Sequence, residues 1–220
     1  MKLFALLSLL LPPCKLKNKI LNLFNHVNVD GDCYIGFSYI DVENLTIERC
    51  VRIKHFVKIR GLRSVLLKEN SYIGNHNSIY CNIKLGAHGN FFLGKNSELI
   101  SRNLLDVTSN INIGNNVVVG GHGSQFWTHG FDTQRNRIQG EIVIHNNVYI
   151  GSSTIFNLNV SVCEDVIIGA GSVVSKSINS RGFYAGAPAS KKNDNFLIRE
   201  TETILLIRQE NEAKFFEKKL

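Results

Sequence analysis

Residues 144–174 read IHNNVYIGSSTIFNLNVSVCEDVIIGAGSVV, and an aliphatic or aromatic residue returns in this stretch at every sixth position. The returning residues are Ile144, Ile150, Phe156, Val162, Ile168 and Val174. The residue four positions further on is small or β-branched in every case but the last: Val148, Thr154, Val160, Val166 and Ser172. A fixed period of this kind is typical of a solenoid, in which equal structural units stack on one another.

The same period extends toward the N-terminus with small phase slips. Its further members are Ile47, Ile53, Ile59, Ile73, Ile79, Leu85, Phe91, Leu93, Leu99, Leu105, Ile113 and Val119. A six-residue period fits a triangular coil in which each side is a short strand with one side chain pointing inward. A β-sandwich, or turns rich in glycine and asparagine, would not produce six consecutive matches at this spacing. The sequence therefore predicts an all-β fold, a parallel β-helix over residues 27–192, with short helices at both ends.

Two segments break the period. Residues 126–140 read FWTHGFDTQRNRIQG and lack the inward positions, so they predict a protruding loop, and a loop of this length is usually functional or disordered. Residues 193–220 interleave apolar and charged side chains and predict a C-terminal capping helix. The apolar members of that pattern are Phe196, Leu197, Ile204, Leu205, Ile207 and Phe215.

Residues 1–26 form an apolar and then amphipathic N-terminal segment. Residues 1–11 read MKLFALLSLLL, which is too short to span a bilayer but resembles a short signal peptide. No small-x-small cleavage site follows. Residues 15–24, KLKNKILNLF, alternate apolar and basic sides. We expect a helix or helix pair that caps the solenoid or rests on a membrane surface, and a cleaved signal stays open as the alternative.

Composition limits the class of protein. The chain has 220 residues with 44% hydrophobic content, which suits one folded domain. Its net charge of +7 is spread along the chain, so a nucleic-acid-binding tail is not indicated, whereas anionic ligands are favoured. The five cysteines are scattered and form no C-x-x-C pair. They predict reduced thiols in a cytoplasm rather than a disulfide framework or a zinc ribbon.

Several ordered motifs resemble one superfamily. They are VYIGSS at 148–153, VIIGAGSVV at 166–174, AGAPA at 185–189 and THGFD at 128–132. Together they resemble the hexapeptide-repeat acyltransferases, which include maltose, galactoside and serine O-acetyltransferases and enzymes that acetylate bacterial surface sugars. The resemblance covers about residues 28–192 and implies a left-handed β-helix, acetyl-CoA as co-substrate and a homotrimer. The chain departs from the pattern at Tyr149, Gly130 and Asn159, where tryptophan, proline and glycine are commoner.

His129 is the candidate catalytic residue. THGFD is similar to the T-x-H-P-L-D stretch of the maltose and galactoside enzymes, whose catalytic histidine corresponds to His129. A neutral imidazole can take the proton of an attacking hydroxyl at pH 7. The resemblance implies direct attack in a ternary complex without a covalent enzyme intermediate.

Four further residues are candidates for the acceptor side of the site. Asp132 would orient the His129 ring or bind acceptor hydroxyls. Trp127 would stack on a sugar face or anchor the loop on a neighbour. Asp106 is a poorer candidate of the same kind, and Asn103 is a weak counterpart of the acceptor-orienting asparagine of the family.

The resemblance places the coenzyme along an edge of the coil. Small residues there would let the pantetheine arm approach the backbone. Pro188 and its neighbour Ala187 would shape the wall near the adenine, and Lys176 and Lys191 would meet the phosphates. The candidate donor residues on the edge itself are Tyr149, Gly151, Ser153, Ala170, Gly171 and Ser172.

These patterns predict an acetyl-CoA-dependent O-acetyltransferase that acts on a sugar hydroxyl in polysaccharide or glycan biosynthesis. It would need no metal and would be cytoplasmic, with peripheral contact to the inner face of the membrane. An N-acetyltransferase acting on an amino-sugar nucleotide and a serine O-acetyltransferase stay open. A zinc carbonic anhydrase would use His122, His129 and His145. A non-enzymatic β-solenoid would show a regular array of one residue type, and the sequence shows no such array.

Overall fold

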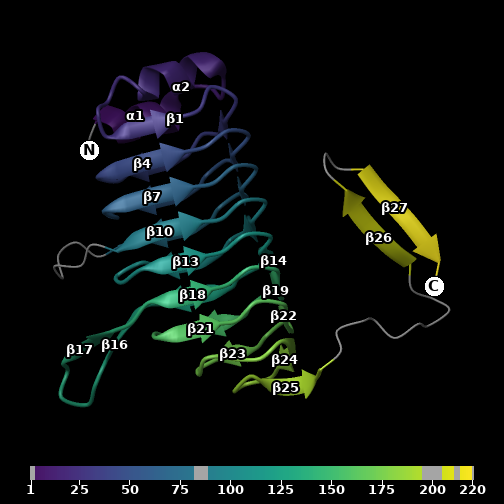
Figure 1. Cartoon of the computed structure of the whole chain (residues 1–220). Helices are drawn as coiled ribbons and strands as arrows, with labels where there is room; N and C mark the ends of the chain where they lie inside the picture. Colours follow the sequence, from purple (N-terminus) through teal and green to yellow (C-terminus); the bar gives the residue numbers. More distant parts are fainter. Residues whose placement is uncertain (1–2, 82–88, 195–204, 211–213, 220) are drawn as a thin grey trace.

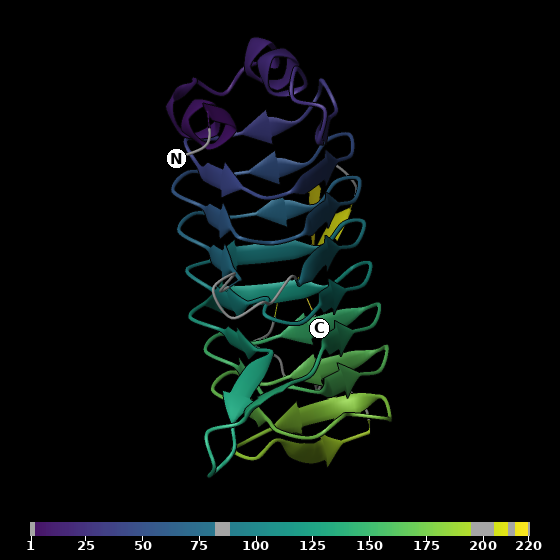
Figure 2. The same cartoon turned by 90° about the vertical axis from the view of Figure 1, so that its left-hand side faces the viewer.

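The computed structural model describes residues 3–81 and 89–194, together with the backbone of residues 205–210 and 214–219. In residues 27–174 of this described part, seven coils stack into a left-handed parallel β-helix (Figure 1, Figure 2). Each coil contributes one short strand to each of three parallel sheets, named A, B and C in chain order. The predicted fold class is confirmed.

The three sheets form the three walls of a triangular prism. Sheet A consists of β1 (Val27–Val29), β4 (Asn44–Ile47), β7 (Ser64–Leu67), β10 (Asn90–Leu93), β13 (Ile111–Ile113), β18 (Ile142–Ile144) and β21 (Val160–Val162). Sheet B consists of β2 (Tyr34–Ile35), β5 (Arg52–Ile53), β8 (Tyr72–Ile73), β11 (Glu98–Ser101), β14 (Val118–His122), β19 (Val148–Ile150), β22 (Val166–Ile168), β24 (Gly182–Ala185) and β25 (Ser190–Asn193). Sheet C consists of β3 (Tyr39–Asp41), β6 (Lys58–Arg60), β9 (Ser78–Tyr80), β12 (Leu104–Asp106), β15 (Gln125–Trp127), β20 (Ile155–Phe156) and β23 (Val173–Val174).

The inward side chains form one continuous core. Ile144 pairs with Val162, Ile150 with Ile168 and Phe156 with Val174, so residues three hexapeptides apart lie directly above one another. All the described residues of the predicted six-residue ladder are buried, whereas Leu85 lies outside the described residues. Because the core is a column, each coil is stabilised chiefly by its two neighbours.

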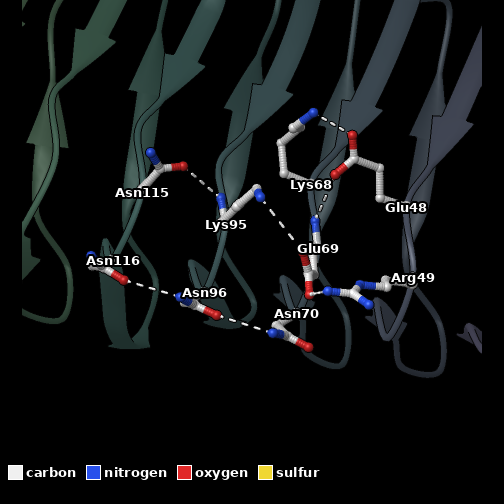
Figure 3. Close-up of polar contacts among 9 residues, drawn as sticks. All are labelled: Glu48, Arg49, Lys68, Glu69, Asn70, Lys95, Asn96, Asn115 and Asn116. Atoms are coloured by element: carbon white, nitrogen blue, oxygen red, sulfur yellow. Dashed lines mark hydrogen bonds and ion pairs between the residues drawn. The ribbon is translucent and has the colours of Figure 1, made fainter. Parts of the chain in front are cut away.

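The corners between sheets A and B carry an asparagine ladder (Figure 3). Asn70, Asn96, Asn116, Asn147 and Asp165 occupy the same corner of successive coils, with φ between 54° and 59°. Each amide donates to the next residue at 3.1–3.3 Å. Asparagine tolerates this left-handed backbone better than most residues. An array of one residue type therefore exists, contrary to the sequence interpretation, because only the fold brings these residues into line.

Two helices close the N-terminal end of the prism. They are α1 (Leu3–Leu10) and α2 (Lys15–Leu21), and they bury Phe4 and Leu21 against the first coil. Lys17 is buried as well, and its Nζ donates to the carbonyl oxygens of Ser8 at 2.7 Å and Gly36 at 2.8 Å. Burial lowers the pKa of this ammonium group to about 8.

Three polar side chains of this cap bind the free backbone edge of the first coil. Asn22 receives the N–H of Val29 at 2.8 Å and donates back to its carbonyl oxygen at 2.7 Å. On the other two walls, Asn18 donates to the carbonyl oxygen of Cys33, and Ser8 accepts the N–H of Ile40. Each of the three walls thus has a side chain of the cap hydrogen-bonded to its first strand or to the residue just before it.

The C-terminal helix is a wrong prediction in the described residues. The chain there forms an antiparallel hairpin of β26 (Leu205–Glu210) and β27 (Lys214–Lys219). The apolar residues form two short runs, LLI and FF, and such runs suit strands as well as they suit one helical face. Phe196, Leu197 and Ile204 of the predicted pattern lie outside the described residues.

Candidate active site

The excursion from the coil is narrower than the sequence predicts. Phe126 is fully buried and stacks on Phe156 in the core, with ring centroids 4.6 Å apart, so β15 still belongs to the fifth coil. The chain leaves the wall after Thr128 and forms an antiparallel hairpin of β16 (His129–Phe131) and β17 (Arg137–Gln139). This hairpin projects from the corner between sheets C and A (Figure 1, Figure 2).

His129 is the first residue of the hairpin, and its side chain bonds to a carboxylate of the preceding coil, the fourth. Its Nδ1 lies 2.5 Å from Oδ2 of Asp106, the last residue of β12. The side chain of His129 is 19% exposed, whereas Asp106 is fully buried. A carboxylate beside Nδ1 holds the proton on that nitrogen, so the lone pair lies on Nε2. The geometry therefore presents an oriented imidazole with a free basic nitrogen.

Donor groups of three residues hold the Asp106 carboxylate. Besides His129, the hydroxyl of Thr108 donates to Oδ1 at 2.7 Å and the backbone N–H of Thr128 donates to Oδ2 at 3.3 Å. The Thr128 hydroxyl also donates to the Asp106 backbone carbonyl at 2.7 Å. A buried carboxylate is stable in its charged form only when such donors surround it. Asp106 thus acts on His129, and it has no exposed surface for the acceptor contact that the sequence suggested.

Two aromatic residues flank this pair on the outer face of sheet C. The register places Tyr80 of β9 on one side of Asp106 and Trp127 of β15 on the other. Burial, and next the negative charge of Asp106, raise the pKa of the Tyr80 hydroxyl. The Trp127 indole donates to Gln125 at 3.0 Å. In the hairpin, the Phe131 ring meets the His129 ring edge-on, with centroids 5.9 Å apart.

Asp132 lies in the turn of the hairpin and not beside the His129 imidazole nitrogens. Its Oδ1 accepts the backbone N–H groups of Gln134 and Asn136, and its Oδ2 accepts the Asn136 amide, all at 2.8 Å. These bonds lower the pKa of the Asp132 carboxyl, the Asn136 side chain having the largest effect. Asp132 therefore shapes the turn, and Asp106 has the orienting role that the sequence assigned to Asp132.

Asn103 is buried inside the corner between sheets B and C. Its amide donates to Oδ1 of Asn77 at 3.0 Å, and its Oδ1 accepts the N–H of Ser124 at 3.0 Å. These partners belong to the coils above and below. Asn103 therefore holds adjacent coils together, and the structure does not place it where an acceptor could reach it.

Most of the candidate donor residues gather at the corner between sheets B and C. Ser153 lies there in the sixth coil, Ala170 and Gly171 in the seventh, and Ala187 and Pro188 in the turn that follows β24, and all five are exposed. Backbone bonds align these turns: Gly171 donates to Ser152 at 2.8 Å, and Val173 donates to Gly186 at 2.9 Å. The result is an exposed edge of small side chains.

The remaining candidates are buried in this corner or lie elsewhere. Gly151 and Ser172 are buried in the same corner. A Cβ atom on Gly151 would collide with the backbone nitrogen of Ala170, so this glycine is needed for coil stacking. Lys176 follows β23 at the corner between sheets C and A. Lys191 belongs to β25 and forms a salt bridge with Asp194.

Tyr149 belongs to a groove on the outer face of sheet B. The groove has a volume of about 380 Å³, and its floor consists of Val118, Tyr149 and Ile167 from three successive strands. Asp165 and Arg181 lie on its rim. Tyr149 is 48% exposed, so its ring is available to a ligand at this wall.

The three histidines of the zinc alternative lie at three different corners of the prism. His122 ends β14 at the corner between B and C, His129 starts the hairpin at the corner between C and A, and His145 follows β18 at the corner between A and B. In the described part of the chain, no group of three or more histidine, cysteine or acidic side chains converges as metal ligands would.

Comparisons with known proteins agree with this architecture. No family model matches the chain. A 107-residue stretch is 31% identical to the galactoside O-acetyltransferase of Escherichia coli, covering 49% of this chain and 51% of that protein. The bifunctional protein GlmU of Wigglesworthia glossinidia brevipalpis is 26% identical over 204 residues, 91% of this chain and 34% of that protein. The chain has the fold and the repeat of the hexapeptide-repeat acetyltransferases.

A solved hexapeptide-repeat structure is similar over most of the chain. The polysialic-acid-specific acetyltransferase NeuO is 20% identical with a TM-score of 0.49, and the match covers 81% of this chain and 84% of that one. The chain spans about half the length of the galactoside enzyme and about a third of GlmU.

Sequence reasoning missed the threonines and the tyrosine around Asp106. Thr108, Thr128 and Tyr80 have no motif that marks them. A signal was nevertheless present for Asp106, because it follows the inward Leu105 in a strand that otherwise lies between apolar neighbours. A carboxylate at such a position needs a partner, and His129 was the candidate base.

Proposed function

We propose that the protein is an acetyl-CoA-dependent O-acetyltransferase that acts on a sugar hydroxyl, in polysaccharide or glycan biosynthesis. The observation that carries this proposal is the bond between His129 and the buried Asp106, which leaves a basic nitrogen free on a solvent-accessible imidazole. The similarity of the chain to a galactoside O-acetyltransferase supports the same reaction class.

The reaction needs one base and no covalent enzyme intermediate. Nε2 of His129 takes the proton as the acceptor hydroxyl attacks the thioester carbonyl carbon. The tetrahedral intermediate then collapses, the carbon–sulfur bond breaks, and the imidazolium returns the proton to the coenzyme A thiolate. The buried charge of Asp106 stabilises the imidazolium while it exists.

The donor would lie along the corner between sheets B and C. The exposed small residues there, Ser153, Ala170 and Gly171, leave room for an extended pantetheine arm beside the backbone. Ala187 and Pro188 continue the same edge, and Lys191 and Arg181 lie on the adjoining wall. These basic groups are our candidates for the phosphates, whereas Lys176 lies at a different corner.

A single copy does not bring the donor edge and His129 together. His129 lies at the corner between sheets C and A, and the whole width of sheet C separates that corner from the donor edge. We propose a homotrimer in which the hairpin of one copy approaches the donor edge of the next. A closed ring of three copies repeats this contact at each boundary and yields three equal sites.

The alternatives differ in the acceptor and in the class of protein. An amino-sugar nucleotide or serine as acceptor would use the same base and donor edge. A zinc anhydrase would need His122 and His145 to meet His129 from other copies. A non-enzymatic solenoid would explain the asparagine ladder, but it gives no reason for a buried carboxylate that orients an accessible imidazole.

We also propose that the N-terminal cap contacts the surface of an anionic membrane, which would place the enzyme at the inner face. In the described residues, no helix has the length and apolar character that a membrane crossing requires. Leu3, Leu10, Leu16 and Leu23 are each more than 60% exposed on the cap. Residues 1–29 contain lysines but no acidic residue. Apolar contact and positive charge together favour an anionic interface. A Leu10→Glu, Leu16→Glu variant should lose co-sedimentation with phosphatidylglycerol vesicles, and equal binding would contradict the proposal.

The central test measures coenzyme A release from acetyl-CoA with a panel of sugar acceptors. We expect the wild type to release thiol with at least one sugar, and we expect His129→Ala to lower kcat by about 10²–10⁴-fold. His145→Ala is the control because it removes a different histidine, which is exposed and lies at another corner. Equal rates for the wild type and His129→Ala would overturn the assigned role of His129. No thiol release with any acceptor would overturn the activity.

A further inference from the structure

The corner between sheets B and C changes character along the prism. In the fifth to seventh coils its left-handed positions hold the small residues Gly123, Ser153 and Gly171. In the second to fourth coils the same positions hold Phe56, His76 and Arg102, all exposed, with φ between 53° and 61°. We call Phe56, His76 and Arg102, with Phe37 and His55 beside them, the aromatic edge.

Backbone hydrogen bonds align the corner residues of the aromatic edge in one column. The N–H of Phe56 donates to the carbonyl oxygen of Phe37 at 2.8 Å, and that of His76 donates to His55 at 3.2 Å. Arg102 donates in the same way to Asn75 at 3.1 Å. Since each corner residue lies over the previous coil, the side chains form a single exposed row.

The rings of the aromatic edge contact one another, and Phe56 and His76 are stacked. Phe56 and His76 are parallel within 18°, with centroids 5.1 Å apart, and Phe37 lies 5.6 Å from His55. His55 is held in place, since its Nδ1 accepts the N–H of Phe37 and its Nε2 bonds to the Tyr34 hydroxyl at 2.9 Å. Phe56 is nevertheless 60% exposed. Water therefore meets a rigid row of ring faces and edges.

Backbone preference does not explain the choice of Phe56 and Arg102. Histidine and asparagine are enriched in the left-handed conformation, whereas a bulky ring such as that of Phe56 is an outlier there, and asparagine fills the same conformation along the corner between sheets A and B. Strained positions of this kind gather at functional sites. Exposed aromatic rings held in strained corners therefore point to a ligand.

The charge near the aromatic edge is positive. Lys54 lies next to His55, with its Nζ 5.1 Å from the centre of the Tyr34 ring, and Arg102 ends the row. In the described residues, no carboxylate forms a salt bridge with Lys54 or Arg102. Aromatic rings pack against the C–H faces of sugars, and free cations beside them favour a ligand with acidic groups.

The position of the aromatic edge relates it to the proposed reaction. It lies on the same corner as the donor edge, which begins in the sixth coil, and the fifth coil, from which His129 leaves the wall, separates the two. A long acceptor could run along this corner from the donor edge past the fifth coil. It would then meet Arg102 first, and His76 and Phe56 after it.

We propose that the aromatic edge binds an acidic glycan chain, with sugar rings stacked on Phe56 and His76 and with acidic groups at Arg102 and Lys54. The proposal rests on the proposed function insofar as this chain would be the acceptor or extend from it. It names a binding site of its own, distinct from His129 and from the donor edge.

Binding can be tested without acetyl-CoA, by fluorescence anisotropy of a labelled oligogalacturonate and of a neutral maltooligosaccharide of equal length. Phe56→Asn, His76→Asn is the decisive variant because it removes both rings, leaves formal charge unchanged at pH 7.5, and introduces a residue that suits the left-handed backbone. We expect its dissociation constant for oligogalacturonate to rise roughly tenfold. Arg102→Asn should weaken binding more than Arg135→Asn, an exposed arginine in the same conformation at the hairpin turn.

Several results would overturn the proposal. The first is that the wild-type protein does not bind oligogalacturonate. The second is that it binds oligogalacturonate and the neutral maltooligosaccharide equally well. A third is a double variant that binds like wild type, which would mean general charge attraction. A fourth is a changed oligomeric state in the double variant by light scattering, which would make the edge a subunit contact. Binding without acetyl transfer to any acceptor would overturn the proposed function and leave the aromatic edge supported.

Discussion

Asp106 and His129 are 23 positions apart in the sequence, yet Oδ2 of the aspartate lies 2.5 Å from Nδ1 of the histidine. One residue ends a strand of the fourth coil, and the other begins the hairpin that leaves the fifth. The stacking of coils creates this contact, and it fixes which nitrogen of His129 carries the proton.

The first prediction concerns Asp106→Asn. The amide carries no negative charge to stabilise the imidazolium, and its single oxygen cannot accept at both positions where Thr108 and Thr128 donate, so kcat should fall by about 10²–10⁴-fold. Steady-state thiol release measures this. Asp132→Asn serves as the control because Asp132 only shapes the hairpin turn. A normal kcat for Asp106→Asn would refute the orienting role.

The second prediction concerns the shared site of the proposed trimer. Ala170→Trp should block the donor edge, and His129→Ala removes the base, so each variant alone should be nearly inactive. If each site takes one residue from each of two copies, co-expression in equal amounts should restore about a quarter of wild-type activity, because random assembly leaves that fraction of boundaries intact. No recovery from mixed trimers, verified by differently tagged copies, would place both residues in one copy.

The third prediction concerns the asparagine ladder. Cys50 precedes Asn70 on the same corner and has a φ of 59° without an amide side chain. Cys50→Asn should raise the free energy of unfolding by about 0.5–1 kcal/mol, since asparagine suits this backbone and extends the ladder. Asn116→Ala should lower it by about 1–2 kcal/mol, since it breaks the row and strains the turn. Urea denaturation measures both free energies of unfolding. A decrease for Cys50→Asn together with an increase for Asn116→Ala would contradict a stabilising role of the ladder.

The fourth prediction concerns Lys17. Lys17→Met should destabilise the fold by about 1–3 kcal/mol at pH 7, since it removes the Lys17 donor from the carbonyl oxygens of Ser8 and Gly36. The folded-state pKa of about 8 lies below the unfolded value of about 10.4, so the folded state binds fewer protons between these values. Wild type should therefore gain stability relative to Lys17→Met as the pH rises from about 8 to about 10. A loss over this range would show that the ammonium is favoured in the fold.

The sequence predicted the core but not the contacts between coils. A six-residue period determines which side chains point inward, because the inward positions of a triangular coil repeat by geometry alone. It does not determine what covers an outward residue. Asp106 is outward by register, and residues of other strands and of the hairpin, among them Thr128 and His129, contact it in the folded chain.

Corner residues were hard to judge for the same reason. Asn70, Asn96 and Asn116 look like scattered turn residues in the sequence, and they form a row only after the coils are stacked. Gly151 and Ser172 belong to a recognisable motif, but the motif reflects the close approach of coils as much as any ligand. The prediction of a C-terminal helix was wrong because short apolar runs fit a strand and a helix about equally well.

The N-terminal cap determines how far the solenoid can grow. A stack of parallel strands would otherwise end in open hydrogen-bonding edges, and such edges recruit further strands from other molecules. Asn22 binds two backbone groups on one wall, and Asn18 and Ser8 bind one group each on the other two, so these groups of the first coil are not available to another chain. At the opposite end, the antiparallel β25 carries Lys191 and Lys192, and charged side chains discourage pairing there. Both features disfavour end-to-end pairing of one solenoid with another.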